Sequence, residues 1–122
     1  MSDIVKLNPA DLSDEFLERM ADKFRILGDS TRLAILRCLM AGERSVNEVV
    51  RETGRGQANV SKHLKMLSDA GFLSRRKVGL QVIYRIEDPL VLQLCDSVCA
   101  SIVAEAQAES ERIKAMLESR SR

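Results

Sequence analysis

The sequence predicts a mainly α-helical fold with one small β-hairpin, and two observations carry this prediction. Apolar residues recur at three- and four-residue spacing in about five stretches bounded by capping residues, which is the pattern of amphipathic helices. Between residues 72 and 87 the pattern changes to two stretches rich in β-branched residues around a glycine. A chain of 122 residues has the length of a single domain and buries roughly two thirds of its unfolded surface.

The N-terminal part predicts an arm and two helices. Residues 1–10 show no periodicity, and we expect them to form a flexible arm before a single domain over residues 11–122. Asp11 is expected to cap the first helix, whose apolar residues recur over Leu12–Leu27. Asp29 is expected to cap a second helix, which has two apolar lines and is therefore expected to be buried over a wide surface.

Residues 45–71 predict a helix-turn-helix. Ser45 and Glu48 form a capping box, in which each side chain satisfies an unpaired backbone amide. The short helix that they open ends at Gly54, and the next helix begins near Gln57. Two short helices joined by a tight glycine-containing link are typical of this motif.

The C-terminal half predicts a wing followed by a long helix. Residues 72–87 are expected to form a hairpin with its turn at Val78–Gly79, and Asp88 caps a helix over residues 88–120 that contains no further Gly or Pro after its first turn. This helix would be about 45 Å long, which exceeds the ~26–30 Å diameter of a domain of this size. We therefore expect a second copy of the chain to cover its apolar face in a two-fold dimer, the alternative being a frayed helix on a monomeric core. The face comprises Val91, Leu94, Val98, Ile102, Ala106, Ile113 and Met116.

The charge distribution favours a nucleic-acid-binding centre. The chain has a net charge of +1, but residues 44–86 carry nine Lys or Arg against three Asp or Glu, and both flanks are acidic. A basic segment between acidic flanks is typical of a protein that contacts phosphates with one surface. The alternative is an unevenly charged, solvated surface.

Composition excludes several other classes. The uncharged apolar runs are too short to span a bilayer, and residues 1–6 lack the layout of a signal peptide, so we expect a cytoplasmic protein without a membrane partner. Its three cysteines are then expected to be mostly reduced. One His and no nucleophile–base set indicate that the chain is not an enzyme.

Several short motifs occur in an order that is typical of one family. They are Leu27–Leu36 (LGDSTRLAIL), Gly42–Glu43, Val60–Leu67 (VSKHLKML), Ala70–Gly71, Arg75–Arg76 and Ile83–Tyr84. Over residues 16–105 the chain resembles the ArsR/SmtB family of bacterial transcriptional repressors. The resemblance implies a dimeric winged helix-turn-helix protein that releases operator DNA when an effector binds.

The sequence departs from the family pattern at three places. Arg55 and Gly56 stand where members usually have Leu-Ser before the recognition helix. Residues 46–50 lack the Cys-x-Cys motif of the arsenic and cadmium sensors. The His/Asp/Glu site of the zinc sensors is also missing, since the only His is His63 in the recognition helix.

The predicted DNA contacts lie on this helix and on the wing. Polar side chains that lie off the apolar line of a recognition helix can hydrogen-bond to base edges in the major groove, while basic ones suit phosphates. For the lysines the alternative is an ordinary solvated charge, and His63 suits either a DNA contact or a polar helix-packing role. The candidates are Arg55, Gln57, Ala58, Asn59, Ser61, Lys62, His63, Lys65, Arg75, Arg76 and Lys77.

The cysteines are candidates for an effector site. Cys95 and Cys99 are four residues apart and share one face of the last helix, so two chains could gather four thiols at the dimer seam. Thiolates suit arsenite, Zn(II), Cd(II) or Cu(I), and thiols also react with oxidants or reactive sulfur. Cys38 in the second helix is either a small core residue or a third ligand. Packing alone is the alternative for the 95/99 pair.

Together these observations predict a sequence-specific DNA-binding transcriptional repressor that releases its operator when an effector acts on cysteine thiols. A second hypothesis keeps the DNA-binding regulator but makes the cysteines purely structural, with no metal or thiol effector. A remote third is a protein-interaction module. Only DNA binding through phosphates gives a steep dependence of affinity on salt.

Overall fold

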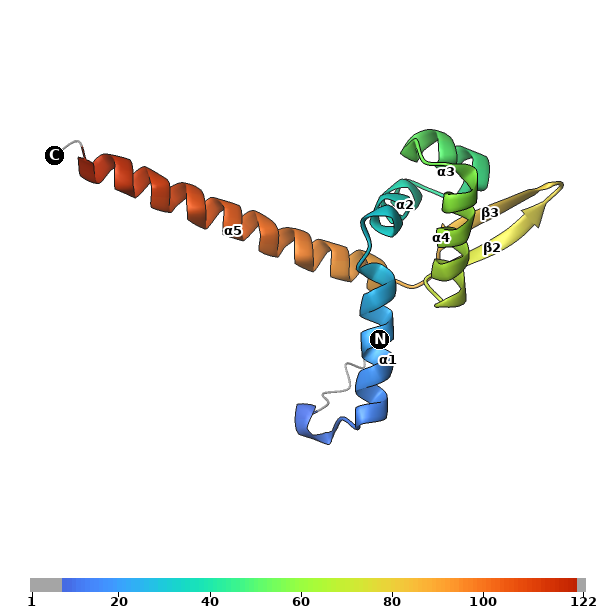
Figure 1. Cartoon of the computed structure of the whole chain (residues 1–122), viewed down its shortest axis with the longest axis horizontal. Helices are drawn as coiled ribbons and strands as arrows, with labels where there is room; N and C mark the ends of the chain where they lie inside the picture. The colour runs from blue at the N-terminus through green and yellow to red at the C-terminus, as the bar shows by residue number, and fades with distance from the viewer. Residues whose placement is uncertain (1–7, 121–122) are drawn as a thin grey trace. The chain divides into compact units, whose positions relative to one another are not determined.

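The computed structural model describes residues 8–120, which form five α-helices and a small antiparallel sheet (Figure 1). The chain divides at Glu87/Asp88 into two compact units. Of the expected N-terminal arm, residues 1–7 lie outside the described residues. The elements in chain order are a 3-10 turn Pro9–Asp11, α1 Asp14–Leu27, α2 Ser30–Met40, β1 Arg44–Ser45, α3 Val46–Thr53, α4 Gln57–Asp69, β2 Leu73–Val78, β3 Gln81–Ile86 and α5 Leu90–Arg120.

Local capping chemistry sets the helix starts. The expected cap at Asp11 is wrong: α1 begins after Ser13, whose hydroxyl accepts a hydrogen bond from the Phe16 amide, because Asp11 is already part of the preceding 3-10 turn. The cap at Asp29 is confirmed by its bond from the Arg32 amide. Both halves of the Ser45–Glu48 capping box are present at the start of α3.

The sheet has three strands where the sequence predicted two. Its order is β1-β3-β2, with Arg44 of β1 opposite Tyr84 of β3. A two-residue strand is too short to show an alternating pattern, so only the pairing partner reveals it. The hairpin turn is also one residue later than expected, because Val78 still pairs with Gln81.

The core of the first unit lies between the helices and the inner face of the sheet. Ile35, Leu36 and Leu39 of α2 are buried, but Leu33 and Met40 are exposed, so the buried surface of that helix is narrower than expected. Val60, Leu64 and Leu67 form the buried line of α4, spaced so that they fall on one side of the helix. This line fixes which side of α4 remains available to solvent.

The second unit is the single helix α5. Its 31 residues correspond to a length of about 46 Å. Its apolar side chains are largely exposed within one chain: Val98, Ile102 and Met116 are 56%, 59% and 60% accessible. By length and composition alone α5 would also qualify as a membrane-spanning helix, a test that helices of soluble proteins pass as well.

Candidate nucleic-acid interface

The turn between α3 and α4 depends on two glycines. Gly54 ends α3 in the left-handed conformation with a φ of 68°, which favours glycine because it has no Cβ. Gly56 is the N-cap of α4 and supplies no side-chain hydrogen bond. Between them, half-buried Arg55 donates to the Thr53 carbonyl at 3.3 Å, so its guanidinium also supports the turn.

The first turn and the solvent-facing side of α4 carry the side chains predicted to read bases. Gln57, Asn59 and Lys62 are exposed, and among the described residues none of their side chains makes a hydrogen bond or an ion pair. Their donors and acceptors are therefore free to bind a ligand without first breaking an internal bond. The exposed residues of this helix are Gln57, Ala58, Asn59, Ser61, Lys62, Lys65 and Asp69.

Lys65 differs from Lys62 in having an internal partner. Its ammonium lies 2.8 Å from the Asp69 carboxylate one turn further along α4, and both groups are well exposed. Exposed pairs of this kind are weak, so the contact does not prevent Lys65 from reaching a phosphate.

His63 packs against the neighbouring helix pair. Its Nδ1 lies 3.1 Å from a guanidinium nitrogen of Arg32, which is 8% exposed. Since arginine only donates, this nitrogen accepts the bond and carries no proton. Arg32 also donates to the carbonyls of Arg25 and Ile26 and contacts the sulfur of Met66. Half-buried His63 thus has the environment of the helix-packing alternative.

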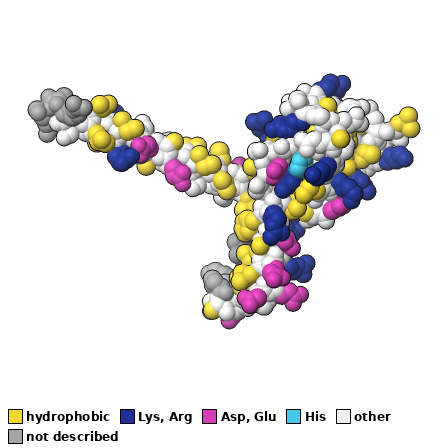
Figure 2. Space-filling model, in the orientation of Figure 1, with side chains coloured by type: hydrophobic (Ala, Val, Ile, Leu, Met, Phe, Trp, Pro, Cys, Tyr) yellow, Lys and Arg dark blue, Asp and Glu magenta, His cyan; other side chains and the backbone are white. Residues whose placement is uncertain are grey.

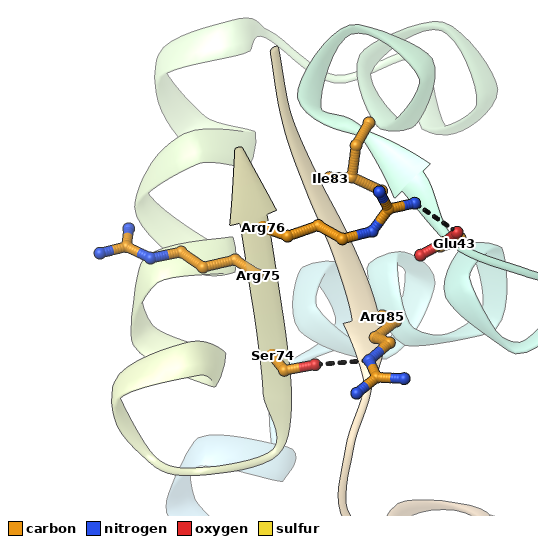
Figure 3. A pocket seen from close by; sticks show the side chains of 6 residues that line it. All are labelled: Glu43, Ser74, Arg75, Arg76, Ile83 and Arg85. Carbon is orange, nitrogen blue, oxygen red and sulfur yellow. Dashed lines mark hydrogen bonds and ion pairs between the residues drawn. The ribbon is translucent and has the colours of Figure 1, made fainter. Parts of the chain in front are cut away.

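The wing divides its basic residues between two faces of the sheet. Arg75 pairs across the strands with Tyr84 on the inner face, whereas Arg76 pairs with Ile83 on the outer face. Figure 3 shows Arg75 pointing away from Arg76, whose guanidinium is 2.7 Å from the Glu43 carboxylate. Lys77 follows on the inner face and is exposed.

Arg85 is a further basic residue on the wing, outside the set of DNA contacts that the sequence predicts. It lies directly opposite Ser74, whose hydroxyl accepts its Nε–H at 2.8 Å, and is on the same face as Arg76. Arg85 stands in an apolar, β-branched stretch (residues 82–86), which indicates a strand but no binding role. The strand pairing is the signal that identifies it.

Charge is unevenly distributed over the first unit. Figure 2 shows Lys and Arg side chains over the helix-turn-helix and wing, and a cluster of Asp and Glu side chains on α1. This arrangement agrees with the basic central segment of the sequence. A polyanion is accordingly attracted to the surface that carries α4 and the wing.

The cysteines occupy three different environments. The Cys38 thiol is half-buried and donates a hydrogen bond to Glu52 at 2.6 Å. Burial first, and then the Glu52 hydrogen bond and charge, raise the pKa of Cys38 to about 11, so this thiol is protonated at neutral pH. Cys95 is half-buried and Cys99 exposed, one turn apart on α5. Within residues 8–120, no three His, Cys, Asp or Glu side chains of one chain form a metal-binding group.

Taken together, α3 and α4 with the three-stranded sheet form a winged helix-turn-helix, the fold of a large class of DNA-binding regulators. Residues 29–75 match the family described as "Bacterial regulatory protein, arsR family". The chain is 33% identical over 96 residues to the arsenical resistance operon repressor of Escherichia coli (strain K12), covering 77% of this chain and 78% of that protein. The protein belongs to the ArsR family.

Two further comparisons agree with this assignment. A probable mercury resistance operon repressor of Streptomyces lividans is 42% identical over 71 residues, which span 58% of this chain and 57% of that protein. The solution structure of a homodimeric winged helix-turn-helix DNA-binding domain from Mycobacterium bovis matches with a TM-score of 0.66 at 29% identity, covering 81% of this chain and 90% of that one. The family is one of regulators, which confirms the expectation that the chain is not an enzyme.

Proposed function

We propose that the protein is a homodimeric cytoplasmic repressor that reads operator DNA with α4 and the wing. The observation that carries this is the set of exposed, unpaired polar side chains in the first turn and on the solvent-facing side of α4. Gln57 and Asn59 have the amide edges that pair with adenine in the major groove, and Lys62 suits a phosphate or a base. The basic residues of the wing supply further phosphate contacts.

A second copy of the chain is the proposed cover for the apolar faces. Phe24 of α1 is 58% exposed, and Val98 and Ile102 of α5 are exposed to a similar degree. Contiguous apolar faces such as these are unfavourable to leave in water. The homodimeric state of the Mycobacterium bovis relative supports the same arrangement. Two α4 helices held about 34 Å apart then enter successive major grooves.

Cys95 and Cys99 are the proposed effector site. The names of the Streptomyces lividans and Escherichia coli relatives refer to mercury and arsenical resistance, and such soft ions prefer thiolate ligands. One chain offers two thiols on one face of α5, so a site with more ligands takes the same pair from a second copy. The high pKa of Cys38 and its bond to Glu52 make it a poorer ligand at neutral pH.

The effector would act through the arrangement of the two subunits rather than at the DNA surface. Cys95 and Cys99 are on α5, whereas the groove-reading residues are on α4. A ligand at the seam needs about 1.4 kcal/mol of preference for a non-binding arrangement to weaken DNA binding tenfold. Oxidants or reactive sulfur acting on the same thiols would use the same route.

The two remaining hypotheses make different predictions. A regulator with structural cysteines binds DNA but responds to no thiol reagent. A protein-interaction module binds DNA weakly or with little salt dependence, since it makes few phosphate contacts. Measuring the slope of log affinity against log salt for an operator fragment separates this module from the two DNA-binding hypotheses.

Variants of α4 test the interface directly. Lys62→Ala should weaken binding to all sequences and flatten the salt slope by about one unit, while Gln57→Ala should relax sequence preference at a cost of about 1–3 kcal/mol. Unchanged affinity in both variants contradicts the placement of α4 in the groove.

The effector site is tested by operator release with arsenite, zinc, cadmium, copper(I), peroxide and polysulfide. The double variant Cys95→Ser/Cys99→Ser should keep nearly the parent DNA affinity and lose release. Cys38→Ser is the matched control, which should still be released if this thiol takes no part. A parent protein that responds to none of these agents leaves the regulator without a thiol effector as the better description.

A further inference from the structure

The outer face of the sheet, turned away from α4, carries a cavity of its own. It has a volume of about 400 Å³ and is lined by side chains from the loop before β1 and from the two wing strands. Figure 3 shows Arg76, Arg85 and Glu43 directed toward the same side of β3, with Arg75 directed away. The complete lining is Glu43, Ser74, Arg75, Arg76, Ile83 and Arg85.

The strand register explains why two arginines meet there. Arg76 is opposite Ile83 and Ser74 is opposite Arg85, so Arg76 and Arg85 are diagonal neighbours on one face. Diagonal neighbours in an antiparallel pair lie about 7–8 Å apart at the backbone, which long side chains bridge easily. The two guanidinium groups can therefore reach one ligand between them.

Each group in this cluster is held by a weak internal partner. Arg76 pairs with Glu43 at 2.7 Å, and Arg85 bonds to the Ser74 hydroxyl at 2.8 Å and pairs with Glu87 at 3.2 Å. The side chains of Arg76 and Arg85 are 58% and 62% accessible, so these contacts are solvated and easily exchanged. The Arg76 guanidinium also holds the pKa of the Glu43 carboxyl below its usual value, so Glu43 is charged at neutral pH.

We propose that Arg76, Arg85 and the Ser74 hydroxyl form a phosphate-binding site on the outer face of the sheet, in which Glu43 is the internal counter-ion that the phosphate replaces. The planar donor forks of two arginines match the oxygens of a phosphate, and the serine hydroxyl retains its proton for a third bond. A carboxylate already seated on Arg76 marks where an anionic oxygen is accommodated. For a phosphate of the DNA backbone the inference rests on the proposed function and extends the contacts beyond α4.

The site makes an unusual prediction for Glu43. Replacing Glu43 by Gln frees Arg76 before the phosphate arrives, so Glu43→Gln should raise DNA affinity about two- to fivefold. The slope of log affinity against log salt should also become steeper by up to about 0.9. In the parent, the displaced Glu43 carboxylate takes up a cation when DNA binds, and Gln at this position does not. Asp22→Asn is the control: it removes the same charge and frees Arg25 from a more exposed ion pair on α1, and it should change neither quantity.

Removing Arg85 should have the opposite effect to Glu43→Gln and lower DNA affinity. Arg85→Ala should lower affinity for every DNA sequence equally and flatten the salt slope by about 0.9. Arg85→Lys should restore the slope but only part of the affinity, because an ammonium cannot form the two-pronged contact. Circular dichroism of each variant checks that the sheet remains folded.

A second arm separates the two sources of phosphate. Inorganic phosphate is titrated into the full-length protein at constant ionic strength, and the Nε–H signals of Arg76 and Arg85 are followed by NMR. A saturable shift that Glu43→Gln strengthens, together with no effect of Arg85→Ala on DNA binding, assigns the site to free phosphate. Effects on DNA without a phosphate shift assign it to the backbone.

Failure of the outer-face site and failure of the proposed function give different results. If Lys62→Ala weakens DNA binding while Arg85→Ala, Glu43→Gln and inorganic phosphate have no effect, the outer-face site is wrong and the proposed function stands. If the parent protein binds no DNA, the proposed function fails, and only the phosphate titration then decides the site: a saturable shift supports it and its absence overturns it.

Discussion

The helix-turn-helix with its wing and the long helix α5 are stabilised in opposite ways. In the first unit, Ile35, Leu64 and Phe72 are fully buried within one chain, and the helices end on defined caps. In α5, Val98 and Ile102 remain more than half exposed. Apart from α1, which has no buried residue, the first unit therefore takes its stability from its own residues, whereas α5 has an apolar surface that a single chain leaves in water.

The core of the first unit offers the largest expected effect. Leu64→Ala removes a fully buried side chain from α4 and should lower the free energy of unfolding by about 2–5 kcal/mol. The loss should not depend on protein concentration, because the contacts are within one chain. Chemical denaturation at two protein concentrations measures this, and a concentration-dependent loss would show that the core of the first unit also depends on a second chain.

The reactivity of the cysteines tests the same difference between the buried first unit and the exposed α5. With a pKa of about 11, Cys38 has about a hundredfold less thiolate at neutral pH than an ordinary cysteine and should be alkylated correspondingly slowly. Its rate should rise about tenfold per pH unit up to about pH 10, because only the deprotonated thiol reacts. Mass spectrometry after timed iodoacetamide treatment follows each site. Rapid labelling of Cys38 at pH 7 contradicts the burial described here, and Glu52→Gln should speed its labelling.

Charges on the apolar face of α5 should separate the proposed subunits. Val98→Asp/Ile102→Asp should shift the protein toward monomer and weaken operator binding at least tenfold, because two half-sites are no longer held together. Analytical ultracentrifugation and DNA titration measure the two effects. Ala100→Asp/Gln107→Asp adds the same charge on other faces of α5 and should leave both unchanged. A dimer that survives the first pair of substitutions places the seam elsewhere.

The smallest effect is expected at a cap. Ser45→Ala removes one half of the capping box of α3 and should cost about 1 kcal/mol of stability. Thermal unfolding measures this loss. Ser13→Ala at the start of α1 provides a comparison in an exposed helix, where the cost should be no larger. A cost at Ser13 that exceeds the one at Ser45 contradicts the stronger local definition of the helix-turn-helix.

The sequence predicted those features that short-range chemistry defines. The cap at Asp29, the capping box at Ser45 and the buried line through Leu64 all follow from residues within a few positions of one another. It failed where a partner distant in the chain decides the outcome. Strand β1 exists only because Tyr84 lies opposite Arg44.

The candidate site shows the same division. Helical spacing selects Asn59 and Lys62, which the structure leaves exposed, whereas Gln57 is exposed in the first turn although the spacing places it on the side of Val60. Arg85 could not be selected, because its relation to Ser74 and Arg76 comes from the register between two strands. Likewise, nothing near His63 in the sequence indicates that its partner is Arg32.

The buried guanidinium of Arg32 has a mechanical consequence. It closes the end of α1 through two backbone carbonyls and at the same time touches His63 and Met66 of α4. Bonds in several directions from one planar group resist both sliding and twisting. Arg32 therefore links the orientation of α1 to that of α4. A rotation of α1 would therefore displace α4 through this side chain as well as through the intervening backbone.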